Sequence, residues 1–188
     1  MHKLALLFTV ISDLFLLVLD IQLIGVITFI LVQIFYGLRI SILKNQDLVK
    51  DFTMRIIFQT SITLLIVFIL KQLDVLINSL LIVTIFYFIY ILTNTILIII
   101  TAAAKPKSNR LSIRLFTIGM VLFLLCDINV GLFNMTAFVT MPENISSLLY
   151  SFSAVLMWTF YAPSQVLLAY SAQAAAKENI NNEILVRG

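Results

Sequence analysis

Charged side chains are scarce in this sequence: Asp, Glu, Lys and Arg make up 11% of its 188 residues, whereas soluble domains carry roughly 25%. Hydrophobic residues make up 62%, and they recur in blocks long enough to cross about 30 Å of hydrocarbon. The composition therefore excludes an ordinary water-soluble domain. It predicts an integral, multi-pass membrane protein, which we expect in the cell (plasma) membrane.

Histidine and cysteine are almost absent. The single histidine, His2, excludes a histidine-ligated zinc site and a Ser-His-Asp triad. The single cysteine, Cys126, cannot form an internal disulfide. No glycine-rich phosphate loop is present either. Any catalysis must therefore use carboxylates, amides, phenols and water, and we expect no metal and no cofactor.

The apolar blocks predict about six membrane-spanning helices. A β-barrel needs strictly alternating strands, and the run at residues 96–100 does not alternate. The fold class is therefore all-α, a polytopic transmembrane helical bundle. The predicted spans are residues 4–21, 22–43, 54–71, 74–101, 111–134 and 146–172.

Positive charges predict the orientation of this bundle. With six spans, all Lys and Arg residues but Lys71 fall on one side of the membrane. Cytoplasmic loops carry the positive excess, so both termini are expected in the cytoplasm. This distribution also explains the formal charge of +3 without nucleic acid as a partner. We expect one transmembrane domain over residues 1–173 and a polar cytoplasmic tail over 174–188, and the oligomeric state stays open.

Two acidic residues lie inside predicted spans. A charged side chain at mid-membrane costs roughly 2.5–3.5 kcal/mol on insertion scales, so Asp13 and Asp127 are functional candidates. Counting along the two spans places both past the midplane, and they could share a depth. Two carboxyl groups in one low-dielectric cavity can hold one proton between them, which suits general acid and base catalysis. The alternative is a hydrogen-bonded contact between helices. Asp20 and Asp74 fall at span ends, where capping is expected.

Neutral polar residues recur on single helix faces and predict a hydrated cavity. Any one pair could instead join two helices, but five spans offer such faces. The sets on one face are Gln33 with Tyr36, Gln59 with Thr63, Tyr87 with Tyr90 and Asn94, and Tyr161 with Gln165. Asn129 and Asn134 follow Asp127 on the fifth predicted span.

Three segments resemble signatures of the YhhN family of membrane lysoplasmalogenases. The first is LLFTVISDLFLLVLDIQLIGVITFILVQIFYGLRI at 6–40, and the others are IGMVLFLLCDINVGLF at 118–133 and FYAPSQVLLA at 160–169. In the first, the family typically has a Gly-Asp pair, a glycine, a phenylalanine and a His near a tyrosine. The residues here at the matching positions are Asp13, Gly25, Phe29 and Tyr36.

This sequence departs from the family pattern at a few positions. Ser12 replaces the usual glycine, Gln33 stands where a histidine is common, and Pro163-Ser164 interrupts an Ala-Gln pair. The family usually has about two further helices on the amino side, so the resemblance implies that this chain begins at the third.

The resemblance implies hydrolysis of the vinyl ether bond of lysoplasmalogens, with a membrane lysophospholipid as the substrate. Asp13 and Asp127 match the acidic positions of the family and would share the acid and base roles. A catalytically inactive lipid-binding module of the same fold and a small proton-coupled transporter remain alternatives. Side chains expected to bind substrate or water are Gln33, Tyr36, Tyr87, Asn94, Asn129, Tyr161 and Gln165.

Overall fold

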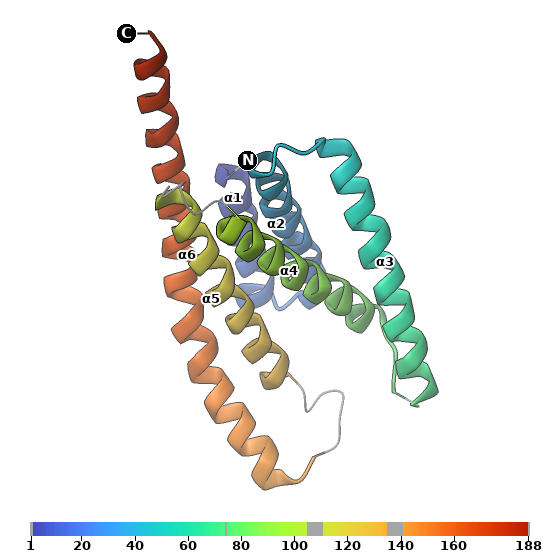
Figure 1. The fold of residues 1–188 in the computed structure, drawn as a ribbon. Coiled ribbons are helices and arrows are strands. Elements are labelled where there is room, and N and C mark those ends of the chain that lie inside the picture. Colours follow the sequence, from blue (N-terminus) through green and yellow to red (C-terminus); the bar gives the residue numbers. More distant parts are fainter. Residues whose placement is uncertain (1, 74, 105–110, 135–140, 188) are drawn as a thin grey trace. The chain divides into compact units, whose positions relative to one another are not determined.

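The computed structural model describes residues 2–73, 75–104, 111–134 and 141–187, and Figure 1 shows that helices dominate them. No strand occurs within these ranges, which confirms the predicted all-helical class. The elements are α1 (His2–Asp13), the π-helix η1 (Leu14–Val18), α2 (Gln22–Leu43), α3 (Leu48–Gln72), α4 (Ser79–Ala104), α5 (Leu111–Phe133) and α6 (Glu143–Arg187).

Five helices, α2 to α6, are long and apolar enough to cross a membrane. The first predicted span corresponds to a shorter apolar helix, Leu4–Val18, which includes η1. These helices confirm the membrane-bundle prediction. The orientation of the termini stays a prediction from the charge distribution.

Helix ends differ from the predicted spans where polar side chains cap them. α3 begins at Leu48 rather than at 54, because the Asp47 side chain accepts hydrogen bonds from the backbone N–H groups of Val49 (3.0 Å) and Lys50 (3.3 Å). α4 begins at Ser79 rather than at 74, and Asn78 Oδ1 accepts from Leu81 N–H at 2.8 Å. Capping thus sets these boundaries, whereas the predicted spans followed hydrophobicity alone.

Two other predictions concern the end of α6 and the turn before α2. α6 continues as a helix to Arg187, through the segment predicted as a polar tail. Asp20, expected to be a cap, lies exposed in the turn before α2 with a φ of 52°. Asp74 lies outside the described residues.

The chain divides into two compact units, Met1–Leu97 and Ile98–Gly188. The first contains α1, η1, α2, α3 and most of α4. In the second, α5 and α6 pack along each other (Figure 1).

α3 is polar on its inner face and apolar on its outer face. Its buried residues are Arg55, Gln59 and Thr63, which follow one another at intervals of four on a single face. Large apolar side chains of the same helix are exposed, including Leu64 and Phe68. This is the reverse of a helix in a soluble protein, and it is the arrangement expected when lipid surrounds the helix.

Close packing of α5 on α6 depends on a glycine. A Cβ added at Gly119 would lie 2.9 Å from Leu168 Cγ and 3.2 Å from Leu168 backbone N, whereas one added at Gly131 of the same helix would meet nothing within 4 Å. We therefore expect Gly119→Ala to destabilise the protein by roughly 1–3 kcal/mol. Gly131→Ala should be neutral or stabilising by up to about 1 kcal/mol. Thermal unfolding in detergent measures both, and equal effects would contradict the close packing.

Candidate functional site

Asp13 lies where the helical hydrogen-bonding pattern changes. It is the last residue of α1 and is half-buried, and the π-helix η1 follows it directly. The backbone hydrogen bonds here span five residues instead of four, since Leu19 N–H donates to Leu14 O at 3.0 Å. Short π-helical segments are frequent at functional sites. No sequence pattern had indicated this irregularity.

The residues around Asp13 join α1 to α2. Ser12 Oγ donates to Gly25 O at 2.5 Å, and Thr28 Oγ1 donates to the same carbonyl at 2.7 Å. A Cβ at Gly25 would lie 2.4 Å from Leu16 Cγ, so only glycine lets η1 approach α2 this closely. The first family-like segment is therefore a packing unit, in which Ser12 adds an interhelical hydrogen bond that a glycine could not make.

Four of the predicted substrate-binding residues lie in the first unit, and two of them are in direct contact. Asn94 Nδ2 donates to Gln33 O at 2.8 Å and to Gln33 Oε1 at 3.1 Å. Tyr36 and Tyr87 are also buried, and the Tyr87 ring lies 5.9 Å from that of Phe29. Gln33 Nε2 is buried with no hydrogen-bond partner among the described residues, so it can still donate to a ligand or water.

Arg55 organises a buried polar cluster that sequence analysis missed. It had been counted only as a cytoplasmic positive charge, but its side chain is 7% exposed. Its Nε donates to Asp51 Oδ2 at 2.7 Å and its Nη1 to Asn94 Oδ1 at 2.9 Å. Ser41 Oγ lies 3.5 Å from Nη2 and also donates to Asp51. The Arg55 cluster, which comprises Gln33, Ser41, Asp51, Arg55 and Asn94, thus connects α2, α3 and α4.

Gly37 makes room for this cluster on α2. A Cβ there would lie 3.2 Å from Asn94 Oδ1 and 3.4 Å from Arg55 Nη1. The i, i+4 spacing of Asp51 and Arg55 was the one local signal for an ion pair. The partners on other helices could not be inferred from spacing.

The second unit holds the remaining predicted residues. Asp127 is half-buried on α5, and Asn129 Nδ2 donates to Leu125 O of its own helix at 2.7 Å. On α6, the ring of Tyr161 lies 6.3 Å from that of Phe123, and Gln165 Nε2 is buried without a partner in the described chain. Asp13 and Asp127 belong to different units, and their meeting stays a prediction.

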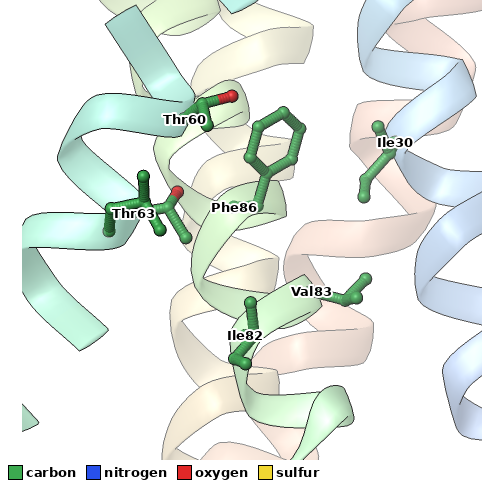
Figure 2. Close-up of a pocket in the computed structure, with 7 residues that line it drawn as sticks. Ile30, Thr60, Thr63, Ile82, Val83 and Phe86 are labelled. Atoms are coloured by element: carbon green, nitrogen blue, oxygen red, sulfur yellow. The ribbon is translucent and has the colours of Figure 1, made fainter. Parts of the chain in front are cut away.

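A cavity of about 230 Å³ lies between α2, α3 and α4 of the first unit. Figure 2 shows side chains from all three helices around it, with Thr60 and Phe86 extending toward the same space. The lining residues are Ile30, Thr60, Thr63, Leu64, Ile82, Val83 and Phe86. Except for two hydroxyl groups, this lining is hydrocarbon.

Within the described ranges, no group of three or more His, Cys, Asp or Glu side chains is placed so that it could hold a metal ion. The expectation of chemistry without a metal or cofactor stays a prediction.

The fold and its inward polar faces define a polytopic helical membrane protein. The chain belongs to the YhhN family, whose sequence profile matches residues 1–172. No curated protein and no solved structure matches the chain. Family membership confirms the resemblance drawn from the three sequence segments.

Proposed function

We propose that this protein is a membrane-embedded hydrolase that cleaves the vinyl ether bond of lysoplasmalogens in the cell membrane. The observation that carries the proposal is Asp13, a half-buried carboxyl group where α1 changes into a π-helix. An acidic side chain within an apolar helix is a functional candidate because its burial in lipid is costly. Membership of the YhhN family supports the assignment.

The chemistry needs only a proton donor, a carboxylate and water. One carboxylic acid protonates the β-carbon of the vinyl ether, which leaves an oxocarbenium ion on the neighbouring carbon. Water adds to that carbon and loses a proton to the carboxylate, as in glycoside hydrolysis. The resulting hemiacetal collapses to a fatty aldehyde and a glycerophospho-base. Asp13 and Asp127 share the acid and base roles in this proposal.

Neutral polar side chains would orient water and the headgroup. Gln33 Nε2 and Gln165 Nε2 are buried donors without a partner in the described chain, so a substrate oxygen or a water molecule would satisfy them. We assign Tyr36, Tyr87, Asn94, Asn129 and Tyr161 to the same group of binding residues. The Arg55 cluster holds Asn94, and through it Gln33, in a fixed position.

Aldehyde release tests the proposal. The purified chain in detergent is incubated with a lysoplasmalogen and, as the matched control, with its saturated alkyl ether analogue. We expect fatty aldehyde from the vinyl ether alone, because only the vinyl ether can be protonated at carbon. Binding of both lipids without aldehyde release would favour a binding module. Solute flux into proteoliposomes that follows a proton gradient would favour a transporter.

A further inference from the structure

Two buried glutamine side chains of the first unit have unsatisfied amide groups. Gln33 of α2 and Gln59 of α3 are both 0% exposed. Among the described residues, nothing bonds to Nε2 of Gln33 or to Nε2 and Oε1 of Gln59. Exchanging the nitrogen and oxygen atoms of the Gln59 amide would not help, because both atoms are unsatisfied. Buried amides are almost always hydrogen-bonded in proteins, so these groups point to a bound polar ligand.

Contacts near the start of α3 bring three helices together at one level. Arg55 Nη1 of α3 donates to Asn94 Oδ1 of α4 at 2.9 Å. A Cβ at Gly37 of α2 would lie 3.2 Å from this oxygen atom and 3.4 Å from Arg55 Nη1. Arg55, Asn94 and Gly37 therefore mark the first level of the three helices.

The cavity between α2, α3 and α4 marks a second level. Ile30 of α2, Thr63 of α3 and Phe86 of α4 all line it (Figure 2). Thr63 lies about two helical turns beyond Arg55 on α3. The lining of the cavity contains no glutamine, so the unsatisfied amides belong to a separate place.

Gln33, Gln59 and Tyr90 lie between these two levels. Gln59 is one turn from Arg55 and one turn from Thr63 on the same face of α3. Gln33 and Tyr90 hold the corresponding positions on α2 and α4, and Tyr90 is 1% exposed. The two glutamines therefore lie at the same depth on neighbouring helices.

The chemistry of the unsatisfied groups selects water as their ligand. They comprise two donors, Nε2 of Gln33 and of Gln59, and one acceptor, Gln59 Oε1. An anion could accept from the donors but could not donate to the oxygen atom, and a metal cation could bind the oxygen atom but not the N–H groups. Water both accepts and donates, and a buried water molecule typically makes about three hydrogen bonds.

Polar side chains of α3 lead from this position to the start of the helix. The side chains of Asp51 and Arg55 are 16% and 7% exposed, and Gln59, one turn further, is 0% exposed. The charge distribution predicts that the start of α3 faces the cytoplasm. Water can therefore reach Gln59 along polar groups instead of crossing hydrocarbon.

We propose that Gln33 and Gln59 bind an internal water molecule that bridges α2 and α3 within the first unit. This water takes the place of a direct hydrogen bond between the two amides. Use of this water in hydrolysis rests on the proposed function, whereas its binding does not. The inference gives Gln59 the role of a water ligand.

X-ray radiolysis of the full chain in nanodiscs tests this site. Hydroxyl radicals formed from a bound water molecule oxidise the side chains beside it, and mass spectrometry locates the oxidised residues. We expect oxidation of Tyr90, whereas Phe116 of α5, an equally buried aromatic residue, should stay unmodified. Gln59→Leu should lower the oxidation of Tyr90 about tenfold, because two of the three hydrogen bonds to the water are lost.

Matched variants separate loss of the water from general disturbance. Gln72→Leu makes the same change at an exposed position of the same helix and should leave the oxidation of Tyr90 unchanged. Gln59→Met is a second apolar variant if Gln59→Leu fails to fold. Thermal unfolding in detergent should show a midpoint about 2–4 °C lower for Gln59→Leu than for the native chain, because a hydrogen-bonded amide is removed.

Three outcomes would overturn the proposed site. The first is oxidation of Tyr90 no faster than that of Phe116, and the second is unchanged oxidation of Tyr90 in a folded Gln59 variant. The third is a higher unfolding midpoint for Gln59→Leu, which would show that the native amide is unsatisfied.

Radiolysis needs no substrate, so its result is independent of hydrolysis. Oxidation of Tyr90 that depends on Gln59, without aldehyde release from lysoplasmalogen, would contradict the proposed function alone. Aldehyde release with oxidation of Tyr90 that does not depend on Gln59 would contradict the water site alone.

Discussion

Asp13→Asn lowers aldehyde release from lysoplasmalogen by about 10²- to 10⁴-fold, the range that general acid or base catalysis contributes. Asparagine keeps the shape of the side chain but can neither donate a carboxylic acid proton nor accept one as a carboxylate. Substrate binding should change much less than turnover, because the proposal assigns substrate binding to other side chains. Steady-state rates of aldehyde formation in detergent, with thermal unfolding of the same samples, measure both effects.

Asp20→Asn is the matched control for this substitution. It makes the same change in the same helical hairpin, at an exposed turn residue with a φ of 52°. Asparagine tolerates that left-handed backbone conformation, so activity should stay at the native level. Comparable losses of activity in Asp13→Asn and Asp20→Asn would show that the removal of a negative charge from the hairpin, rather than the loss of proton transfer, causes the effect.

Asp127→Asn should resemble Asp13→Asn if the two acids act as a unit. Residues that act together show strongly non-additive losses, so the double variant should be about as inactive as either single one. If the fold-losses in aldehyde release of the single variants multiply in the double variant, the two acids have independent roles. Unchanged aldehyde release in both single variants would exclude the acid-pair mechanism.

Arg55→Met destabilises the protein by roughly 3–5 kcal/mol, as expected when one partner of a buried ion pair is removed. The substitution leaves the Asp51 carboxylate, 16% exposed, without its guanidinium. It also removes the hydrogen bond from Arg55 Nη1 to Asn94 Oδ1, which connects α3 to α4. Unfolding by a denaturing detergent, followed by circular dichroism, measures the loss.

Two variants show whether the ion pair causes this loss. Lys50→Met removes an exposed positive charge from the same helix and should change the free energy of unfolding by less than about 0.5 kcal/mol. Asp51→Asn with Arg55→Met should be less destabilised than the sum of the two single variants, because no unpaired carboxylate remains. Additive losses would show that the pair contributes little beyond packing.

The helical bundle could be predicted because lipid imposes one rule along the whole chain. Backbone groups must be satisfied within each span, so a long apolar block predicts a helix. The starts of α3 and α4 could not be placed in this way, since Asp47 and Asn78 determine them through capping hydrogen bonds. Hydrophobicity carries no information about such caps.

Several residues of the candidate site could be predicted from the sequence, but the contacts between them could not. Gln33 and Asn94 were expected to face inward, and both are fully buried. Their pairing joins residues 61 positions apart, which no local periodicity reveals. Arg55 was missed because a positive charge near a span end ordinarily marks topology, whereas here Asp51 neutralises it inside the protein. Asn129 donates a hydrogen bond to a carbonyl of its own helix, and its contact with substrate or water stays a prediction.

The π-helix after Asp13 has a consequence for the length of this segment. Each residue of a regular helix turns the chain by about 100°, and a π-helical turn accommodates extra residues because its hydrogen bonds reach five positions back. Deleting one residue from Leu14–Val18 should therefore restore regular winding and rotate Asp13 relative to Gly25. The number of residues in η1 should therefore determine the direction in which the Asp13 carboxyl group points. Insertions and deletions in η1 should then reduce activity more than most substitutions there.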